Sequence, residues 1–109
     1  MDQPVIAQLQ NLARCSPQQE ICGVIGTDYQ VYPVVNAAKN KTTCFVFDKR
    51  EYFNLMKSFA LQGVKILCIY HSHPGNNPEP SKADLEYTKR SGIPQIIVTP
   101  NDYRVVKNA

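Results

Sequence analysis

The chain has 109 residues, of which 43% are hydrophobic and 19% charged, and its formal net charge is +3. These values fit a single folded domain with its own core and exclude a disordered chain. The basic residues are scattered, so nucleic-acid binding is not expected, and no apolar run reaches the roughly 18 residues of a membrane span. The N-terminal sequence MDQPVIAQLQ has no basic start, so we expect no signal peptide.

The first half of the chain predicts one helix and three strands. Residues 4–14 place Val5, Leu9 and Leu12 on one helical face. Three short runs rich in β-branched or aromatic residues follow, which is typical of strands. These runs are residues 20–27 (EICGVIGT), 29–36 (YQVYPVVN) and 42–47 (TTCFVF). A hairpin turn is expected around Asp28.

The second half predicts two helices and three strands. Residues 49–62 form the clearest helix, with Asp48 and Glu51 spaced as a capping box and Gly63 just past the end. A shorter helix is expected over residues 82–90. The strands are residues 64–71 (VKILCIYH), 95–99 (QIIVT) and 103–107 (YRVVK). Helices and strands mix without a repeat or a linker, so the expected fold is one α/β domain around a mixed sheet.

The four cysteines indicate reduced, structural thiols. Cys15, Cys22, Cys44 and Cys68 form neither a CxxC pair nor a zinc-finger spacing. Cys22 and Cys68 lie in apolar strand-like runs, where free cysteine acts as a small hydrophobe and a thiolate is disfavoured. We therefore expect a cytoplasmic protein. A Cys/His hydrolase with Cys22 or Cys68 as nucleophile is a rival hypothesis, which the apolar surroundings disfavour.

Both histidines of the chain lie in one stretch, YHSHPGNNPEPSKAD, residues 70–84. His71 and His73 are two positions apart, and residues i and i+2 of a strand point to the same side. If the strand through Ile69 continues to His73, both imidazoles can reach one ion. A catalytic zinc usually takes three ligands from the protein and leaves one position for water.

Asp84 is the candidate third ligand. It follows His73 by eleven residues, beyond a loop rich in Pro, Gly and Asn, in the first turn of the next expected helix. The helix dipole stabilises an anion at that place. However, Ser81 and Asp84 are also an ordinary helix start, with a hydroxyl N-cap and an acid in the first turn. That second interpretation needs no metal.

The complete pattern resembles the signature of the JAMM (MPN+) metalloprotease family. HSHP (residues 71–74), six further residues, Ser81, two residues and Asp84 match the family pattern of HxH, seven residues, Ser, two residues and Asp. The family also has a glutamate at the start of an apolar, glycine-containing strand, and QQEICGVIG supplies Glu20 in that context. The resemblance covers most of the chain. It implies one domain over residues 1–109 with the MPN/JAB fold, a curved mixed sheet flanked by helices, like that of cytidine deaminases.

The resemblance also implies a zinc-dependent hydrolase. His71, His73 and Asp84 would hold one zinc ion per chain, with water as the fourth ligand. Glu20 would be the general base, and Ser81 would donate a hydrogen bond to the oxyanion of the tetrahedral intermediate. The reaction would be hydrolysis of a peptide or isopeptide bond, without an acyl-enzyme.

The substrate stays open at this point. Only 50 residues separate Glu20 from His71, and 25 follow Asp84, which leaves little room for the ubiquitin-holding insertions of eukaryotic deubiquitinating members. The chain is most similar to the small prokaryotic and phage type, whose expected partners are a ubiquitin-like sulfur carrier or a phage tail component. Phage relatives often carry a C-terminal NlpC-type domain, so this chain is expected to be a free-standing version or an excised domain. The alternative function is an interaction module, for example in phage tail assembly, that binds partners without cleaving them.

Overall fold

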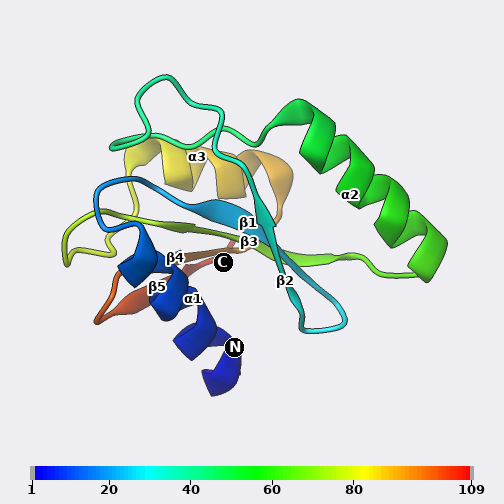
Figure 1. Ribbon diagram of the computed structural model, residues 1–109, viewed down its shortest axis with the longest axis horizontal. Coiled ribbons are helices and arrows are strands. Elements are labelled where there is room, and N and C mark those ends of the chain that lie inside the picture. The colour runs from blue at the N-terminus through cyan, green and yellow to red at the C-terminus, as the bar shows by residue number, and fades with distance from the viewer. Residues whose placement is uncertain (1, 109) are drawn as a thin grey trace.

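The computed structural model describes residues 2–108 (Figure 1). Its elements along the chain are α1 (Gln3–Cys15), β1 (Cys22–Gly26), β2 (Val31–Val34), α2 (Lys49–Gln62), β3 (Ile66–Ser72), α3 (Lys82–Ser91), β4 (Gln95–Val98) and β5 (Tyr103–Val106). The strands form one sheet in the order β2-β1-β3-β4-β5. The β3–β4 pair is parallel and the other pairs are antiparallel. The predicted single α/β domain with a mixed sheet is therefore confirmed. Within residues 2–108, no helix is long and apolar enough to cross a membrane.

Helix α1 covers one face of the sheet, and α2 and α3 lie on the other (Figure 1). The apolar face of α1 buries Val5, Ile6 and Leu9 against strand residues that include Tyr70 and Ile96. Leu9 is fully buried, and burial of such a side chain is worth roughly 1.5–3 kcal/mol. On the opposite face, Phe59 of α2 packs with Val24 and Ile69 of the sheet. The face under α2 and α3 also carries the two histidines.

Strand β3 lies at the centre of the sheet, which explains its long apolar sequence. It pairs with β1 on one side and with β4 on the other. Its last paired residue is Ser72, but the His73 N–H still donates to the Val98 carbonyl of β4 at 3.0 Å. The backbone thus stays extended through His73, as the HxH interpretation requires. The connection from β3 through α3 to β4 then brings the N-terminus of α3 over the end of β3.

The predicted strand at residues 42–47 is wrong. Residues 41–43 form a turn, and the rest of the segment makes a single isolated bridge, between Asn36 and Phe47. The side chain of Asn36 bonds the carbonyl of Cys44 and the N–H of Val46. These backbone groups are therefore taken by a side chain instead of a neighbouring strand.

The predicted capping box of α2 is only half present. The Asp48 carboxylate accepts a hydrogen bond from the Glu51 N–H at 3.0 Å, and Gly63 ends the helix in the left-handed conformation, as expected. The Glu51 carboxylate, however, accepts from the N–H of Val35 at 2.8 Å and not from Asp48. The N–H of Asp48 is already used, because it donates to the Val35 carbonyl. Glu51 thereby joins α2 to the end of β2.

Candidate metal centre

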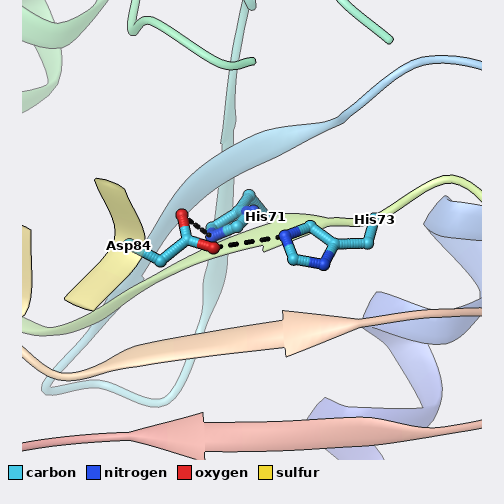
Figure 2. A group of neighbouring side chains, drawn as sticks. All are labelled: His71, His73 and Asp84. Carbon is cyan, nitrogen blue, oxygen red and sulfur yellow. Dashed lines mark hydrogen bonds and ion pairs between the residues drawn. The ribbon is translucent and has the colours of Figure 1, made fainter. Parts of the chain in front are cut away.

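Three side chains from β3 and α3 meet at one point of the fold. The Asp84 carboxylate lies between the two imidazoles, with Oδ1 3.3 Å from His71 Nε2 and Oδ2 3.2 Å from His73 Nε2. Figure 2 shows this arrangement, in which Asp84 reaches from α3 to both histidines. The possible ligand atoms of the three residues all lie within 4.8 Å of one another. The structure therefore brings together the three residues that the sequence suggested as metal ligands.

Local structure holds the Asp84 carboxylate in this place. The Asp84 N–H donates to Ser81 Oγ at 3.1 Å, and the Ser81 N–H donates to Asp84 Oδ2 at 2.9 Å. These two bonds form a complete capping box at the start of α3. The helix-start interpretation of Ser81 and Asp84 is thus confirmed. It does not compete with the metal interpretation, because the same carboxylate caps the helix and faces both histidines.

The donor set and its spacing fit zinc. Zinc bonds of about 2.0–2.1 Å in a tetrahedron place neighbouring ligand atoms about 3.3 Å apart. The two imidazole–carboxylate separations, 3.3 and 3.2 Å, match that edge. They exceed the roughly 2.7–2.9 Å of charge-assisted hydrogen bonds between the same groups. Two imidazoles and one carboxylate also form a common ligand set of catalytic zinc. The three residues could therefore hold a zinc ion with a position left for water.

The electrostatics of the site favour a cation. Burial alone would lower the pKa of His71, but the Asp84 and Glu20 carboxylates more than offset this and raise it to about 9. For Asp84, burial acts to raise the pKa, whereas the two histidines and the capping box hold it well below the usual range. The metal-free protein thus keeps positive charge on a fully buried imidazole. A divalent cation could take over the role of this positive charge beside the carboxylates of Glu20 and Asp84.

Glu20 lies just before β1 and contacts Nδ1 of His71, the ring nitrogen that does not face Asp84. Its carboxylate is buried, with Oε1 3.4 Å from Nδ1 of His71. That nitrogen is buried and makes no hydrogen bond. Backbone contacts fix the position of Glu20, since its N–H donates to the Lys41 carbonyl at 2.6 Å and its carbonyl accepts from Asn36 Nδ2 at 2.9 Å. The expected glutamate is therefore next to the candidate ligands.

A pocket of about 450 Å³ opens at the candidate metal centre. Its lining includes Glu20, His73, Ser81 and Asp84. The segment 43–47 forms one wall of this pocket, and we call it the wall segment. Within the wall segment, the Phe45 ring stacks on His71 with ring centres 4.4 Å apart. An aromatic wall beside charged groups can exclude water from them.

Two polar residues, which the sequence analysis did not single out, organise the site. Asn36 connects Glu20 to the wall segment through hydrogen bonds with four backbone groups. Gln95 is fully buried and contacts both His71 and α3. In the sequence, each of these two residues is a polar amide at one end of an apolar run predicted as a strand. Their partners lie far along the chain, so this signal alone could not identify them.

The cysteines do not offer a competing catalytic site. Burial raises the pKa of Cys22 to about 12 and that of Cys68 to about 11, so both stay protonated near neutral pH. All four cysteines are free thiols, and Cys15 and Cys44 are exposed. The expectation of reduced cysteines agrees with the structure. The hypothesis that Cys22 or Cys68 acts as a nucleophile loses its physical basis.

Comparison with known proteins assigns the family. The family model for prokaryotic homologues of the JAB domain matches residues 2–108. The chain belongs to this family. As a JAB domain, it is 26% identical to a desampylase of Haloferax volcanii over 103 residues, which cover 89% of this chain and 74% of the relative. It is 29% identical to a probable TtuB-protein conjugate cleaving protease of Thermus thermophilus over 68 residues, which cover 62% of this chain but only 45% of that protein.

Solved structures agree with the JAB assignment at the level of the fold. A protein of Desulfitobacterium hafniense superposes with a TM-score of 0.74 at 24% identity, covering 94% of this chain and 77% of the other. A JAB1/MPN domain protein of Archaeoglobus fulgidus superposes with a TM-score of 0.61 at 19% identity, covering 94% and 83%. The expected MPN/JAB fold is therefore confirmed. The reported relatives give no support to the predicted role in phage tail assembly.

Proposed function

We propose that this JAB domain is a zinc-dependent peptidase that cleaves the bond between a ubiquitin-like protein and its conjugated partner. The observation that carries the proposal is the convergence of Glu20 with His71, His73 and Asp84, three of which line one pocket. The names of the two relatives, a desampylase and a probable TtuB-protein conjugate cleaving protease, support conjugates as the substrate class. A ubiquitin-like sulfur carrier in the cytoplasm is the partner that we favour.

The roles of the residues follow from their chemistry. His71, His73 and Asp84 would hold the zinc ion. Bound zinc lowers the pKa of water to about 7 and polarises a carbonyl group. Glu20 would accept the proton of the attacking water and deliver it to the leaving amine, because its carboxylate is not one of the candidate ligands and lies 3.4 Å from His71 Nδ1. Burial of Glu20 excludes bulk water from this transfer.

Ser81 would stabilise the oxyanion. Its Oγ already accepts a hydrogen bond from the Asp84 N–H, and this bond fixes the position of the oxygen. An oxygen that accepts keeps its own O–H free to donate. Ser81 is exposed and lines the pocket beside Asp84, so its O–H can reach a substrate carbonyl. Removing one such donor typically lowers kcat by about 10²–10³-fold.

A second candidate function is an interaction module that binds a conjugate without cleaving it. The exposed apolar side chain of Val46 in the pocket wall favours a protein partner in either case. The two functions differ in what they require of Glu20. Binding needs only the surface of the pocket, whereas cleavage needs a carboxylate that moves a proton.

The test compares wild-type protein with Glu20→Gln on a conjugate of a ubiquitin-like sulfur carrier. We expect cleavage by the wild type and a loss of about 10²–10⁴-fold in Glu20→Gln, with zinc binding retained. Tight binding without cleavage by the zinc-loaded wild type would support the interaction module instead. A drop of about 10–100-fold in the zinc affinity of Glu20→Gln would assign Glu20 to orienting His71 through Nδ1.

A further inference from the structure

Gln95 occupies a position where an apolar residue would be expected. It is the first residue of β4, a strand whose other members are Ile96, Ile97 and Val98, and its side chain is fully buried. In the parallel pairing of β3 with β4, Gln95 lies beside Ile69. Side chains alternate along a strand, so Gln95 projects from the same face of the sheet as His71. Burying an amide there costs free energy unless its polar atoms are satisfied.

The hydrogen bonds of Gln95 fix the orientation of its amide. Its Nε2 donates to the main-chain carbonyl of Asp84 at 2.6 Å and to Thr88 Oγ1 at 2.7 Å. A carbonyl oxygen can only accept, so the nitrogen must point to α3. The amide oxygen Oε1 then faces His71, 3.1 Å from Nε2. It can accept a hydrogen bond from that nitrogen only in the metal-free protein, because an imidazole nitrogen that binds zinc carries no proton. One side chain on β4 thus contacts a candidate ligand on α3 and another on β3.

The bond from Gln95 to the Asp84 carbonyl matters most, because it can persist when zinc is bound and the ligands come from separate elements. His71 and His73 are at the end of β3, and Asp84 follows a loop with three prolines and one glycine at residues 74–80. Such a loop does not by itself set the distance from α3 to β3. The amide of Gln95 holds the first turn of α3 against the sheet at the residue that carries the carboxylate. Partners that orient ligands in this way often control metal affinity.

We propose that Gln95 is a positioning residue of the metal centre, which sets the distance between the Asp84 carboxylate and the His71 imidazole. The proposal rests on the proposed zinc site and adds a residue outside the HxH…Ser…Asp pattern. Thr88 assists by holding the amide of Gln95, because its hydroxyl accepts the second N–H. Gln95 itself is not assigned as a metal ligand.

The experiment measures zinc affinity by competition with a chromophoric chelator, at a temperature where every variant is folded. Gln95→Met keeps the side-chain length but removes both the donors and the acceptor, and we expect a zinc affinity about 10–100-fold weaker. Thr88→Val should weaken zinc binding by a smaller factor in the same direction. Ile96→Ala is the matched control. Ile96 is the next residue of β4 and packs on the α1 face, so its truncation destabilises the fold without touching the site.

The control separates a positioning role from general destabilisation. Ile96→Ala should bind zinc within about twofold of wild type, even though its metal-free form melts at a lower temperature. The visible absorption of bound Co²⁺ gives a second readout, which should change in Gln95→Met and not in Ile96→Ala.

Equal zinc affinities in wild type and Gln95→Met, or equal losses of affinity in Gln95→Met and Ile96→Ala, would overturn the proposal. If Gln95→Met does not fold, unchanged zinc affinity in Thr88→Val would overturn it. A wild-type protein that binds no zinc would refute the proposed function and this inference together.

Discussion

Replacing Asn36 by alanine should both destabilise the fold and detach the wall of the candidate site. The Asn36 amide uses its full hydrogen-bonding capacity on the backbone. It donates to the carbonyls of Glu20 and Cys44 at 2.9 and 3.0 Å, and it accepts from the N–H groups of Ala38 and Val46 at 3.0 and 3.1 Å. Asn36→Ala removes all four bonds.

The expected cost follows from these four bonds. Each is worth about 0.5–1.5 kcal/mol net, and together they amount to about 2–6 kcal/mol. Cys44 and Val46 are exposed, so water can replace part of what their backbone groups lose. We therefore expect a decrease of about 3 kcal/mol in the free energy of unfolding, a large share of the 5–15 kcal/mol typical of a domain. Cleavage should fall by up to about 10²-fold, because Glu20 loses one of the two backbone bonds that fix its position and keeps only the bond to the Lys41 carbonyl.

Urea denaturation of the metal-free protein measures the first effect. Asn54→Ala, at an exposed position of α2, is the control and should stay within about 0.5 kcal/mol of wild type. Asn36→Asp is a sharper variant, because it keeps one acceptor oxygen but turns a second oxygen toward the carbonyls of Glu20 and Cys44. It should be destabilised at least as much as Asn36→Ala. If the free energy of unfolding decreases by less than about 1 kcal/mol in both Asn36 variants, this reasoning is refuted. Such a small decrease is what a single hydrogen bond contributes.

Two further predictions concern titration and thiol chemistry. In the metal-free protein, the pKa of His71 is raised to about 9 from 6.5, so its protonation stabilises the fold below pH 6.5 and this contribution is lost as the pH rises toward 9. The free energy of unfolding in a chelator should therefore fall by up to about 3 kcal/mol over that range, and His71→Gln should abolish the dependence; a rise over the same range would contradict it. Iodoacetamide at neutral pH should alkylate only the two exposed cysteines, Cys15 and Cys44, in the folded protein, as mass spectrometry can show. Rapid labelling of a buried cysteine would show that its thiol is more accessible and acidic than the structure indicates.

The sequence predicted the features of this protein that depend on interactions between residues close together in the chain. The HxH pair was predicted because strand alternation depends only on neighbouring residues, and the backbone does stay extended to His73. The start of α3 was predicted because Ser81 and Asp84 are three residues apart and cap the helix themselves. Gly63, expected just past the helix over residues 49–62, is left-handed and ends α2. Gly92 ends α3 in the same conformation.

The remaining features depend on contacts between distant parts of the chain. The segment 42–47 has the composition of a strand, but its backbone bonds to the Asn36 side chain, which no periodicity reveals. Glu51 has the spacing of a capping box, but its carboxylate accepts a hydrogen bond from the N–H of Val35, the residue after β2. Gln95 contacts His71, 24 residues earlier in the chain. Such contacts become visible only when the sheet is assembled.

Zinc analysis of the wild type and of Asp84→Asn tests whether His71, His73 and Asp84 hold a metal ion. Asparagine keeps the size of the aspartate and part of its capping ability, but it removes the negative charge that a zinc ligand supplies. We expect about one zinc per wild-type chain after reconstitution and dialysis, and the loss of most of it in Asp84→Asn. A wild-type chain without zinc, or an Asp84→Asn chain that keeps the full amount, would contradict the assignment of His71, His73 and Asp84 as a metal centre.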